Sequence, residues 1–339
     1  MKGEPSLSDI RGQDRAKALL EGILSGGLSS GALLLWGPEG VGKRSSMLAL
    51  SRKILCGGDP GRSPCGRCLS CRMPLDRHPD FRLLAPGESS SLGIEAVRDL
   101  LRGTLEAPLI SPLRIAVVDD AHLLTPEASN SLLKSLEEPS GNLLFVLVTP
   151  SPDRLLSTLL SRLLKVRFAP LSDAALQELV RTLRPDTPKD DAERAISMAG
   201  GSVGRLLSLL EAPPSDPVAG TRAFLGAIGS GGTVDQRAVA EAFPFLSEKE
   251  GFEVFLDGLE RLLLSAERAS AGLPALPGWS ETPLPALYAR EGPDFLRARL
   301  HDRIGEMRRL AVHNINRGLA LEQFLGQIGE IFSSKGSGK

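Results

Sequence analysis

A glycine-rich segment near the start of the chain has the residue types and spacing of a phosphate-binding loop. It reads Gly37-Pro38-Glu39-Gly40-Val41-Gly42-Lys43, between an apolar run at residues 32–36 and a helical pattern at 45–55. The glycines let backbone N–H groups close around a phosphate, the helix N-terminus adds a favourable dipole, and Lys43 would reach the outer phosphates. A strand-to-helix turn without a ligand is the alternative, and the complete spacing favours nucleotide binding, as ATP or ADP.

The residue after the loop lysine lacks the hydroxyl that would bind a metal ion. Phosphate loops of this kind place Ser or Thr there, and its hydroxyl holds Mg²⁺. This chain has Arg44 instead. Ser45 cannot simply replace the missing hydroxyl, because one helical residue rotates the side chain by about 100°. We therefore expect a nucleotide site whose magnesium position is damaged.

A second acidic element follows the apolar run at residues 115–118, where Asp119, Asp120 and then His122 occur. Asp119, at the end of a buried strand, would hold the metal through water. Asp120 stands where ATPases of this kind usually carry Glu, which polarises the attacking water. Asp is shorter by one methylene, and a displacement of about 1 Å can cost about a hundredfold in rate. The chain is therefore expected to hydrolyse ATP weakly or not at all, with His122 as a turn residue.

All four cysteines of the chain lie close together in sequence. Cys56, Cys65, Cys68 and Cys71 have the spacing C-x8-C-x2-C-x2-C, within a segment rich in Gly, Pro and Arg. Three cysteines at this spacing cannot all be core residues of one helix or strand, but they can converge on a tetrahedral Zn²⁺. Four thiolates leave no open coordination position, which predicts a structural zinc. Reactive or disulfide-bonded thiols are the alternatives.

The elements that must position these residues form an α/β pattern. Short apolar runs occur at residues 32–36, 81–84, 115–118, 143–148 and 164–168, and they alternate with helical patterns such as 94–105 and 127–138. Continuous apolar strands that alternate with helices predict a parallel sheet covered on both faces. The sequence thus predicts an α/β domain over residues 1–170.

Only helical patterns follow this domain. Amphipathic stretches occur at residues 173–183, 190–198 and 203–210. They predict a small helical lid over residues 171–212. Helical patterning continues to about residue 332, interrupted by a Pro- and Gly-rich loop at 272–285, and predicts a second helical domain over residues 213–335.

Composition narrows the function classes. The 339 residues carry a net charge of −1, and 4% are aromatic. A protein that binds DNA alone is more often basic, and a base-stacking surface needs aromatic side chains. Any DNA contact should therefore be local or shared. No run approaches the about eighteen apolar residues of a membrane span, and residues 1–14 lack the apolar core of a signal peptide. We expect a cytoplasmic protein with no membrane contact.

The order of these motifs resembles the bacterial DNA polymerase III clamp-loader subunits, gamma/tau and delta-prime, which belong to the AAA+ proteins; the pattern is most like delta-prime. The segments that carry the resemblance are Ile10-Arg11-Gly12-Gln13, the phosphate loop, the four cysteines, His78-Pro79-Asp80, Asp119-Asp120-Ala121-His122, residues 128–139 (close to A-x-N-A-L-L-K-x-L-E-E-P) and residues 157–162 (similar to T-I-L-S-R). Leu163 replaces the Cys that ends the last family block. The resemblance covers about the first 210 residues and fades afterwards, except at 314–325.

The resemblance implies a fold and a set of partners. The fold is an AAA+ P-loop domain with a parallel sheet and a zinc knuckle inserted at residues 56–71, then a helical lid and a helical collar. The collar would join the chain with gamma/tau and delta subunits in a hetero-pentameric ring. The implied function is to load the sliding clamp onto primed DNA with ATP.

The resemblance also implies roles for single residues. Arg162, preceded by Ser161, matches an arginine finger that enters the ATP site of the neighbouring subunit, where such a residue is worth about 10³–10⁵ in rate. The alternative is a helix-end Arg in a surface ion pair, which would contribute little. Arg205 is similar to the lid arginine called sensor 2. Thr149, after the run at 143–148, lies where sensor 1 is found.

Three functions remain open at this level. Arg44 and Asp120, and the lack of a long proline-rich tail, favour a delta-prime-like subunit that supplies Arg162 and barely hydrolyses ATP. A gamma/tau-type motor ATPase of the same complex is the second. A free-standing zinc-bearing module that binds nucleotide or nucleic acid is the third.

Overall fold

The structure is a computed structural model that describes most of the first 211 residues and parts of the remainder. The described residues are 6–26, 30–58, 64–87, 91–104, 106–137, 142–211, 249–274, 276, 301–311 and 324. Most of the predicted collar (213–335), most of the loop at 272–285 and the family-like segment 314–325 apart from Phe324 lie outside them.

The chain divides into two compact units. One contains Met1–Leu183 and Gly200–Arg205, and the other contains Arg184–Ala199 and Leu206–Lys339. The division predicted from the sequence, into residues 1–170, 171–212 and 213–335, has three parts and stays a prediction.

The first unit is built on a parallel sheet, as the sequence predicts. Its strands are β1 (Gly31–Trp36), β2 (Phe81–Leu84), β3 (Arg114–Val118), β4 (Leu143–Thr149) and β5 (Leu164–Arg167). They pair in parallel in the order β2-β3-β4-β1-β5. Every residue of β3 and β4 is buried, as expected for inner strands that are covered on both faces. The five predicted runs agree with the strands to within one residue at each end.

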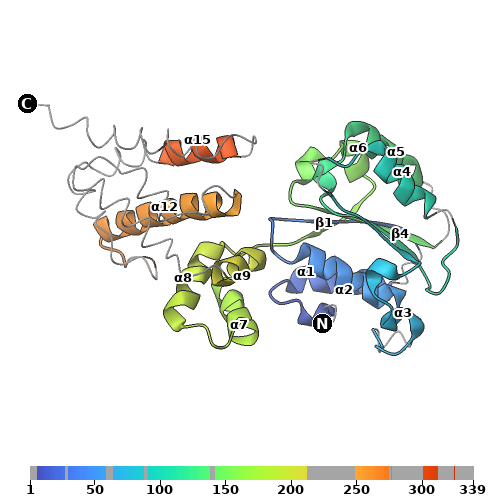
Figure 1. The fold of residues 1–339 in the computed structure, drawn as a ribbon, viewed down its shortest axis with the longest axis horizontal. Helices are drawn as coiled ribbons and strands as arrows, with labels where there is room; N and C mark the ends of the chain where they lie inside the picture. Colours follow the sequence, from blue (N-terminus) through green and yellow to red (C-terminus); the bar gives the residue numbers. More distant parts are fainter. Residues whose placement is uncertain are drawn as a thin grey trace, which may run out of the picture. The chain divides into compact units, whose positions relative to one another are not determined.

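Helices cover both faces of this sheet. The helices described in this unit are α1 (Asp14–Ser25), α2 (Lys43–Leu55), α3 (Leu69–Arg72), α4 (Ile94–Arg102), α5 (Pro126–Glu137), α6 (Ser157–Leu160) and α7 (Asp173–Leu183), although not all of them contact the sheet. Figure 1 shows α1 and α2 on one face of the sheet and α4 and α5 on the other. On the second face Val97 and Leu132 pack with strand residues such as Phe145 in one apolar core. Helix α4 ends three residues before the predicted limit, at Arg102, where Gly103 caps it.

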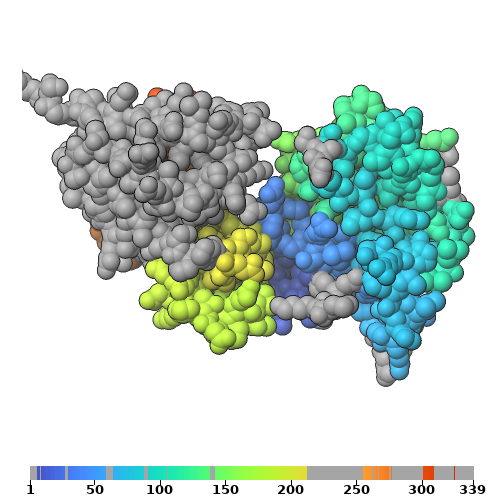
Figure 2. Space-filling view, in the orientation of Figure 1, coloured from blue at the N-terminus to red at the C-terminus, as the bar shows by residue number. Residues whose placement is uncertain are grey.

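Four short 3-10 turns complete the described part of the first unit. They are η1 (Leu7–Asp9), η3 (Leu75–Arg77), η4 (Ala121–Leu123) and η5 (Pro152–Arg154). The segment that contains α3 lies at the periphery of this unit, where Figure 2 shows it exposed in light blue.

The described part of the second unit is helical. Its helices are α8 (Lys189–Ala199), the greater part of α9 (Val203–Glu211), α12 (Lys249–Ser270) and α15 (Asp302–Ala311). Helices α12 and α15 pack together, and Phe255 and Ile304 are among their buried residues. Arg308 of α15 forms ion pairs with Asp257 and Glu260 of α12. Among the described helices, none has the length and apolar character needed to cross a membrane.

Candidate nucleotide and metal sites

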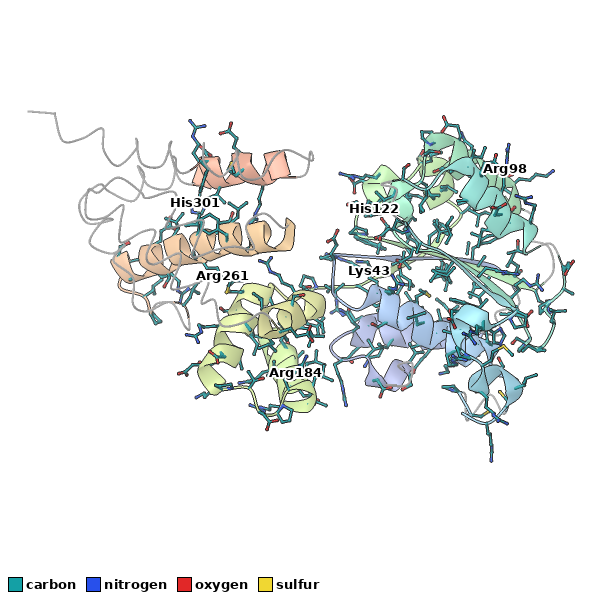
Figure 3. The ribbon with its side chains drawn as sticks, in the orientation of Figure 1. Lys43, Arg98, His122, Arg184, Arg261 and His301 are labelled. Atoms are coloured by element: carbon teal, nitrogen blue, oxygen red, sulfur yellow. The ribbon has the colours of Figure 1, made fainter. Side chains whose placement is uncertain are left out.

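The strand order places the predicted nucleotide-binding residues together, at the edge of the sheet where its parallel strands end. The phosphate loop follows β1, Asp119 follows β3 and Thr149 ends β4, and these three strands are neighbours. Because parallel strands end at the same edge, the three segments meet there, as in other α/β sheets that bind ligands. The backbone N–H of Gly37 donates to the Thr149 carbonyl oxygen at 3.4 Å. Figure 3 shows Lys43 and His122 toward this end of the sheet.

The phosphate loop has the backbone that its glycines permit. Gly37, Gly40 and Gly42 have φ values of 145°, 71° and 97°, which side chains rarely tolerate. Lys43 is the first residue of α2, and its ammonium donates to the carbonyl oxygens of Gly37 at 2.6 Å and Pro38 at 2.5 Å. Burial lowers the pKa of Lys43. An arriving phosphate would give this buried ammonium an anionic partner, so the loop fits a nucleotide.

Arg44 forms an ion pair with the acid that should hold the metal. Its Nη1 lies 3.1 Å from Oδ2 of Asp119, and the side chains are 61% and 6% exposed, respectively. Burial raises the pKa of Asp119, although Arg44 opposes this effect. The backbone N–H of Asp120 donates to the other carboxylate oxygen of Asp119 at 3.1 Å. A guanidinium thus contacts the carboxylate at the point where Mg²⁺ would need it, and these residues do not fit a magnesium site.

Asp120 has an unusual backbone. Its φ of 49° is the only positive value among the described non-glycine residues. Such backbone strain is concentrated at functional sites. The carboxylate is partly exposed, and its Oδ1 lies 4.0 Å from Nδ1 of His122 in η4. Burial lowers the pKa of His122, so this imidazole is a neutral turn residue at pH 7. Ser45 is exposed on α2, one helical step from Arg44.

Two contacts of the phosphate loop involve residues to which the sequence gave no role. The backbone N–H of Gly204, at the start of α9, donates to the Gly40 carbonyl oxygen at 3.1 Å. A Cβ on Gly40 would lie 2.0 Å from Oγ of Ser202, so a side chain at this position would displace that hydroxyl in addition to straining the backbone at a φ of 71°. Buried Gln13 donates from Nε2 to the carbonyl oxygens of Val41 and Ala169. The family-like segment at 10–13 was the one signal for Gln13.

Arg162 lies at the surface, directly after α6. Its guanidinium donates to the Thr158 carbonyl oxygen at 2.7 Å and forms an ion pair with Glu137 of α5. The two side chains are 35% and 48% exposed. An exposed pair of this kind contributes about 0–1 kcal/mol, so a stronger anion could displace Glu137. Arg205, the other predicted arginine, lies in the first turn of α9 beside the loop-contacting Gly204.

The four cysteines converge in space. None of these four described cysteines forms a disulfide, and their Sγ atoms lie within 4.8 Å of one another. The Sγ atoms of Cys65 and Cys71 are 4.0 Å apart. A tetrahedral zinc with Zn–S bonds of about 2.3 Å places its sulfurs about 3.8 Å apart. Backbone N–H groups of Gly58, Cys65, Cys68 and Cys71 donate to cysteine sulfurs of this cluster. The donor set and its geometry fit a structural zinc.

The thiols of this cluster differ in their acidity. Hydrogen bonds from the backbone N–H groups of Arg67 and Cys68 lower the pKa of Cys65 to about 6. Burial raises the pKa of Cys71 to about 12. Because neighbouring thiolates repel one another, the last thiol of the cluster to ionise is difficult to deprotonate. A bound dication would remove this repulsion and keep all four sulfurs ionised.

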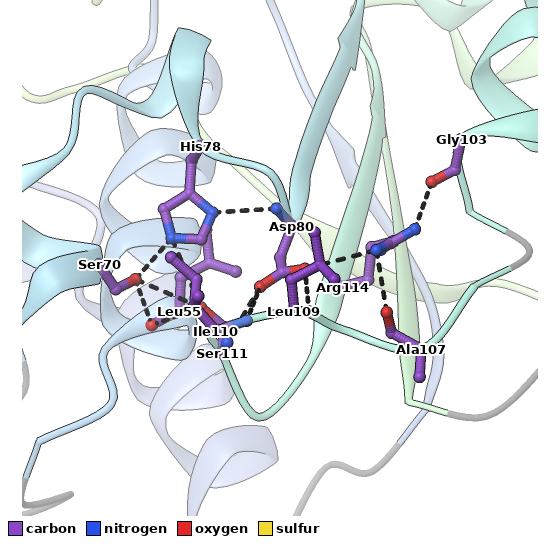
Figure 4. A network of polar contacts seen from close by, with 10 residues as sticks. All are labelled: Leu55, Ser70, His78, Asp80, Gly103, Ala107, Leu109, Ile110, Ser111 and Arg114. Atoms are coloured by element: carbon purple, nitrogen blue, oxygen red, sulfur yellow. Dashed lines mark hydrogen bonds and ion pairs between the residues drawn. The ribbon is translucent and has the colours of Figure 1, made fainter.

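A buried polar network, drawn in Figure 4, joins the cysteine segment to the sheet. His78 accepts the Asp80 backbone N–H at Nδ1, 3.1 Å away, and its Nε2 lies 2.6 Å from Oγ of Ser70 in α3. Nδ1 is therefore an acceptor, and Nε2 carries the proton that bonds Ser70. The Ser70 hydroxyl in turn donates to the Leu55 carbonyl oxygen at the end of α2. Burial lowers the pKa of His78, consistent with this neutral form.

Asp80 anchors the second half of the network. Its carboxylate is fully buried and accepts the backbone N–H groups of Leu109, Ile110 and Ser111. It also lies 3.5 Å from the buried guanidinium of Arg114, at the start of β3. Burial opposes ionisation of Asp80, but these N–H groups and Arg114 outweigh it and lower its pKa. The His78-Pro79-Asp80 segment therefore positions the loops beside the cysteines.

Replacing Asp80 with Asn should destabilise the first unit by about 3–5 kcal/mol, because it leaves the Arg114 guanidinium buried without its counter-charge. The urea midpoint of unfolding at pH 7 measures the effect. Asp99→Asn is the matched control, since Asp99 forms an exposed pair with Arg102. The depressed pKa of Asp80 stabilises the fold above its unfolded pKa of about 4, and this contribution disappears as the pH falls below that value. Equal midpoints for the two variants would contradict this role.

Comparison with known proteins identifies the relatives of the chain. The family described as "DNA polymerase III, delta subunit" matches residues 12–172. DNA polymerase III subunit delta-prime of Pseudomonas aeruginosa is 30% identical over 261 residues, which cover 76% of this chain and 68% of that protein. The Escherichia coli delta-prime subunit is 38% identical over 184 residues, covering 53% of this chain and 54% of that protein.

Gamma-type relatives match as well. The gamma/tau subunit of Mycobacterium tuberculosis is 29% identical over 255 residues, covering 74% of this chain. The match spans 44% of that protein, so this chain covers less than half of its length. Among solved structures, the DNA polymerase III gamma subunit-related protein of Thermotoga maritima is similar with a TM-score of 0.46 and 17% identity, over 94% of this chain and all of that one.

Proposed function

We propose that this chain, which belongs to the family of bacterial DNA polymerase III clamp-loader subunits, is a delta-prime-like subunit that turns over little or no ATP itself. It would help to load the sliding clamp onto primed DNA as one member of a hetero-pentameric ring with gamma/tau and delta subunits. The observation that carries the proposal is the ion pair between Arg44 and Asp119. Four cysteines would hold a structural zinc in this subunit.

The Arg44–Asp119 pair argues against a motor subunit. Phosphoryl transfer needs a metal ion held by a Ser or Thr hydroxyl and an acid, and a group that orients the attacking water. Here Arg44 replaces the hydroxyl and contacts the acid, while Asp120 is one methylene shorter than the usual Glu. A gamma/tau-type motor is therefore less well supported. A free-standing zinc-bearing module is disfavoured by the delta-prime similarity over most of the chain.

The catalytic contribution of this subunit would be made to its neighbour. Arg162 is exposed, and its carboxylate partner Glu137 is exposed too, so the guanidinium is available to a neighbouring γ-phosphate. Its planar, always charged fork suits a phosphate group whose negative charge redistributes during transfer. In the same proposal Thr149 and Arg205 occupy the sensor positions of the chain's own nucleotide site.

The isolated chain should show little or no ATPase activity with Mg²⁺ present. Arg44→Thr together with Asp120→Glu should raise the rate, because the pair restores a metal-binding hydroxyl and the longer acid. Phosphate release by the purified protein measures both results. Asp153→Glu, at an exposed position in η5, is the control for a lengthened acid. ATP turnover by the unmodified chain at about 1 s⁻¹ or faster would contradict the delta-prime-like assignment.

A further inference from the structure

Two successive cations begin helix α2, and each already has partners. Lys43 donates to loop carbonyl oxygens at 2.6 and 2.5 Å, and Arg44 lies 3.1 Å from Asp119. We propose that the phosphate loop binds a nucleoside di- or triphosphate without a divalent metal ion, with the Arg44 guanidinium, held by Asp119, in place of that ion. The inference rests on the nucleotide site of the proposed function, and it does not depend on the role of Arg162.

A guanidinium can supply much of the positive charge with which a metal ion neutralises the phosphates of a bound nucleotide. In sites of this type Mg²⁺ is tied to the acid after the strand and neutralises the β- and γ-phosphate oxygens. Arg44 is tied to the same acid through Nη1. Its side chain is nevertheless 61% exposed, so further N–H donors of the fork can reach an incoming phosphate. Arginine keeps its charge at any physiological pH and binds phosphate oxygens in a bidentate manner.

The same geometry leaves few ligands available to a metal ion. One carboxylate oxygen of Asp119 pairs with Arg44, and the other accepts the Asp120 backbone N–H at 3.1 Å. The residue after Lys43 offers a cation where a hydroxyl ligand is required, and it would repel Mg²⁺. Asp119 is only 6% exposed, so it cannot readily turn outward to meet a hydrated ion. Magnesium should therefore add little to nucleotide affinity.

The test is equilibrium binding of fluorescent ADP and ATP analogues to the full, zinc-loaded chain. Buffers are freed of divalent ions before use, without a chelator that would also remove zinc, and Mg²⁺ is then added back. Wild-type affinity should agree within about twofold in the two buffers. Arg44→Thr should bind about tenfold more weakly than wild type without Mg²⁺, because a charge-assisted contact is lost. Added Mg²⁺ should then recover most of that loss through the new hydroxyl.

Two controls separate this effect from general damage. Arg98→Thr removes an exposed arginine that pairs with Glu95 on α4, and Figure 3 shows Arg98 toward the opposite end of the sheet from Lys43. This variant should bind as wild type does in both buffers. Lys43→Ala should lose binding in both, which shows that the analogue occupies the phosphate loop.

Three results would overturn the proposal. They are wild-type binding that requires Mg²⁺, no wild-type binding in either buffer, and an Arg44→Thr variant that matches wild type without Mg²⁺. If Arg44→Thr does not fold, Arg44→Lys replaces it; this variant keeps the charge, loses the fork and should also bind more weakly. None of these measurements uses the assembled loader, so a failure here is distinct from a failure of the trans-acting role of Arg162.

Discussion

Replacing Arg162 with Ala should lower ATP turnover by about 10³-fold or more at the one site in a reconstituted loader that this residue serves. The loader as a whole should lose at least the share of that site in its clamp- and DNA-stimulated ATPase. The reason is that a guanidinium supplied from a neighbour stabilises the charge of the transition state, and alanine cannot. Steady-state phosphate release, compared with a single-turnover measurement, detects both effects.

The surroundings of Arg162 predict what the substitution leaves unchanged. Its partners are the Thr158 carbonyl oxygen, the Ser161 hydroxyl and the exposed Glu137, so folding, zinc content and ring assembly should match those of wild type. Arg162→Lys should recover little activity, since an ammonium lacks the bidentate geometry. Arg184→Ala is the matched control, because Arg184 forms a comparably exposed pair with Glu211. A loader with Arg162→Ala that hydrolyses ATP and loads clamps normally would refute the finger.

Removing one cysteine of the cluster should abolish zinc binding. Metal analysis should find about one Zn²⁺ per wild-type chain and none with Cys68→Ser. A structural zinc site has an apparent binding free energy of about 10–16 kcal/mol at pH 7, part of which orders the surrounding loop. Its loss should loosen the segment around α3 and weaken the contact between Ser70 and His78. Protease sensitivity of this segment and the thermal midpoint measure the effect.

Zinc affinity should also fall as the pH falls. Zinc binds thiolates, and metal-free Cys71 has a pKa of about 12, so binding releases protons near neutral pH. Protons therefore compete more strongly in acid, and a chromogenic chelator should extract the metal faster there. Leu69→Ser is the control, because Leu69 is adjacent to Cys68 and 64% exposed. A metal-free chain that keeps its full stability, or a disulfide between Cys56 and Cys65, would contradict the zinc site.

The sequence by itself determined the local features of this protein. Continuous apolar runs predicted β3 and β4, which are buried along their whole length, because inner parallel strands contact helices on both faces. The spacing of glycines and Lys43 predicted the turn between β1 and α2. The spacing of the cysteines predicted that they converge, and their sulfurs lie within 4.8 Å. Each of these features is encoded in neighbouring residues, so its period or spacing can be read directly.

Only the tertiary structure decided which distant side chains meet. The sequence predicted that Arg44 is unsuited to magnesium, but it did not predict the ion pair of Arg44 with Asp119. It gave no signal that Gly204 would contact Gly40, or that Asp80 would hold the loop before Arg114. These contacts depend on the strand order β2-β3-β4-β1-β5 and on the contact of Gly204 with Gly40, which place segments far apart in the chain side by side. A contact between residues so far apart in the sequence leaves no repeating pattern along the chain, because it forms only when the helices and strands have packed together.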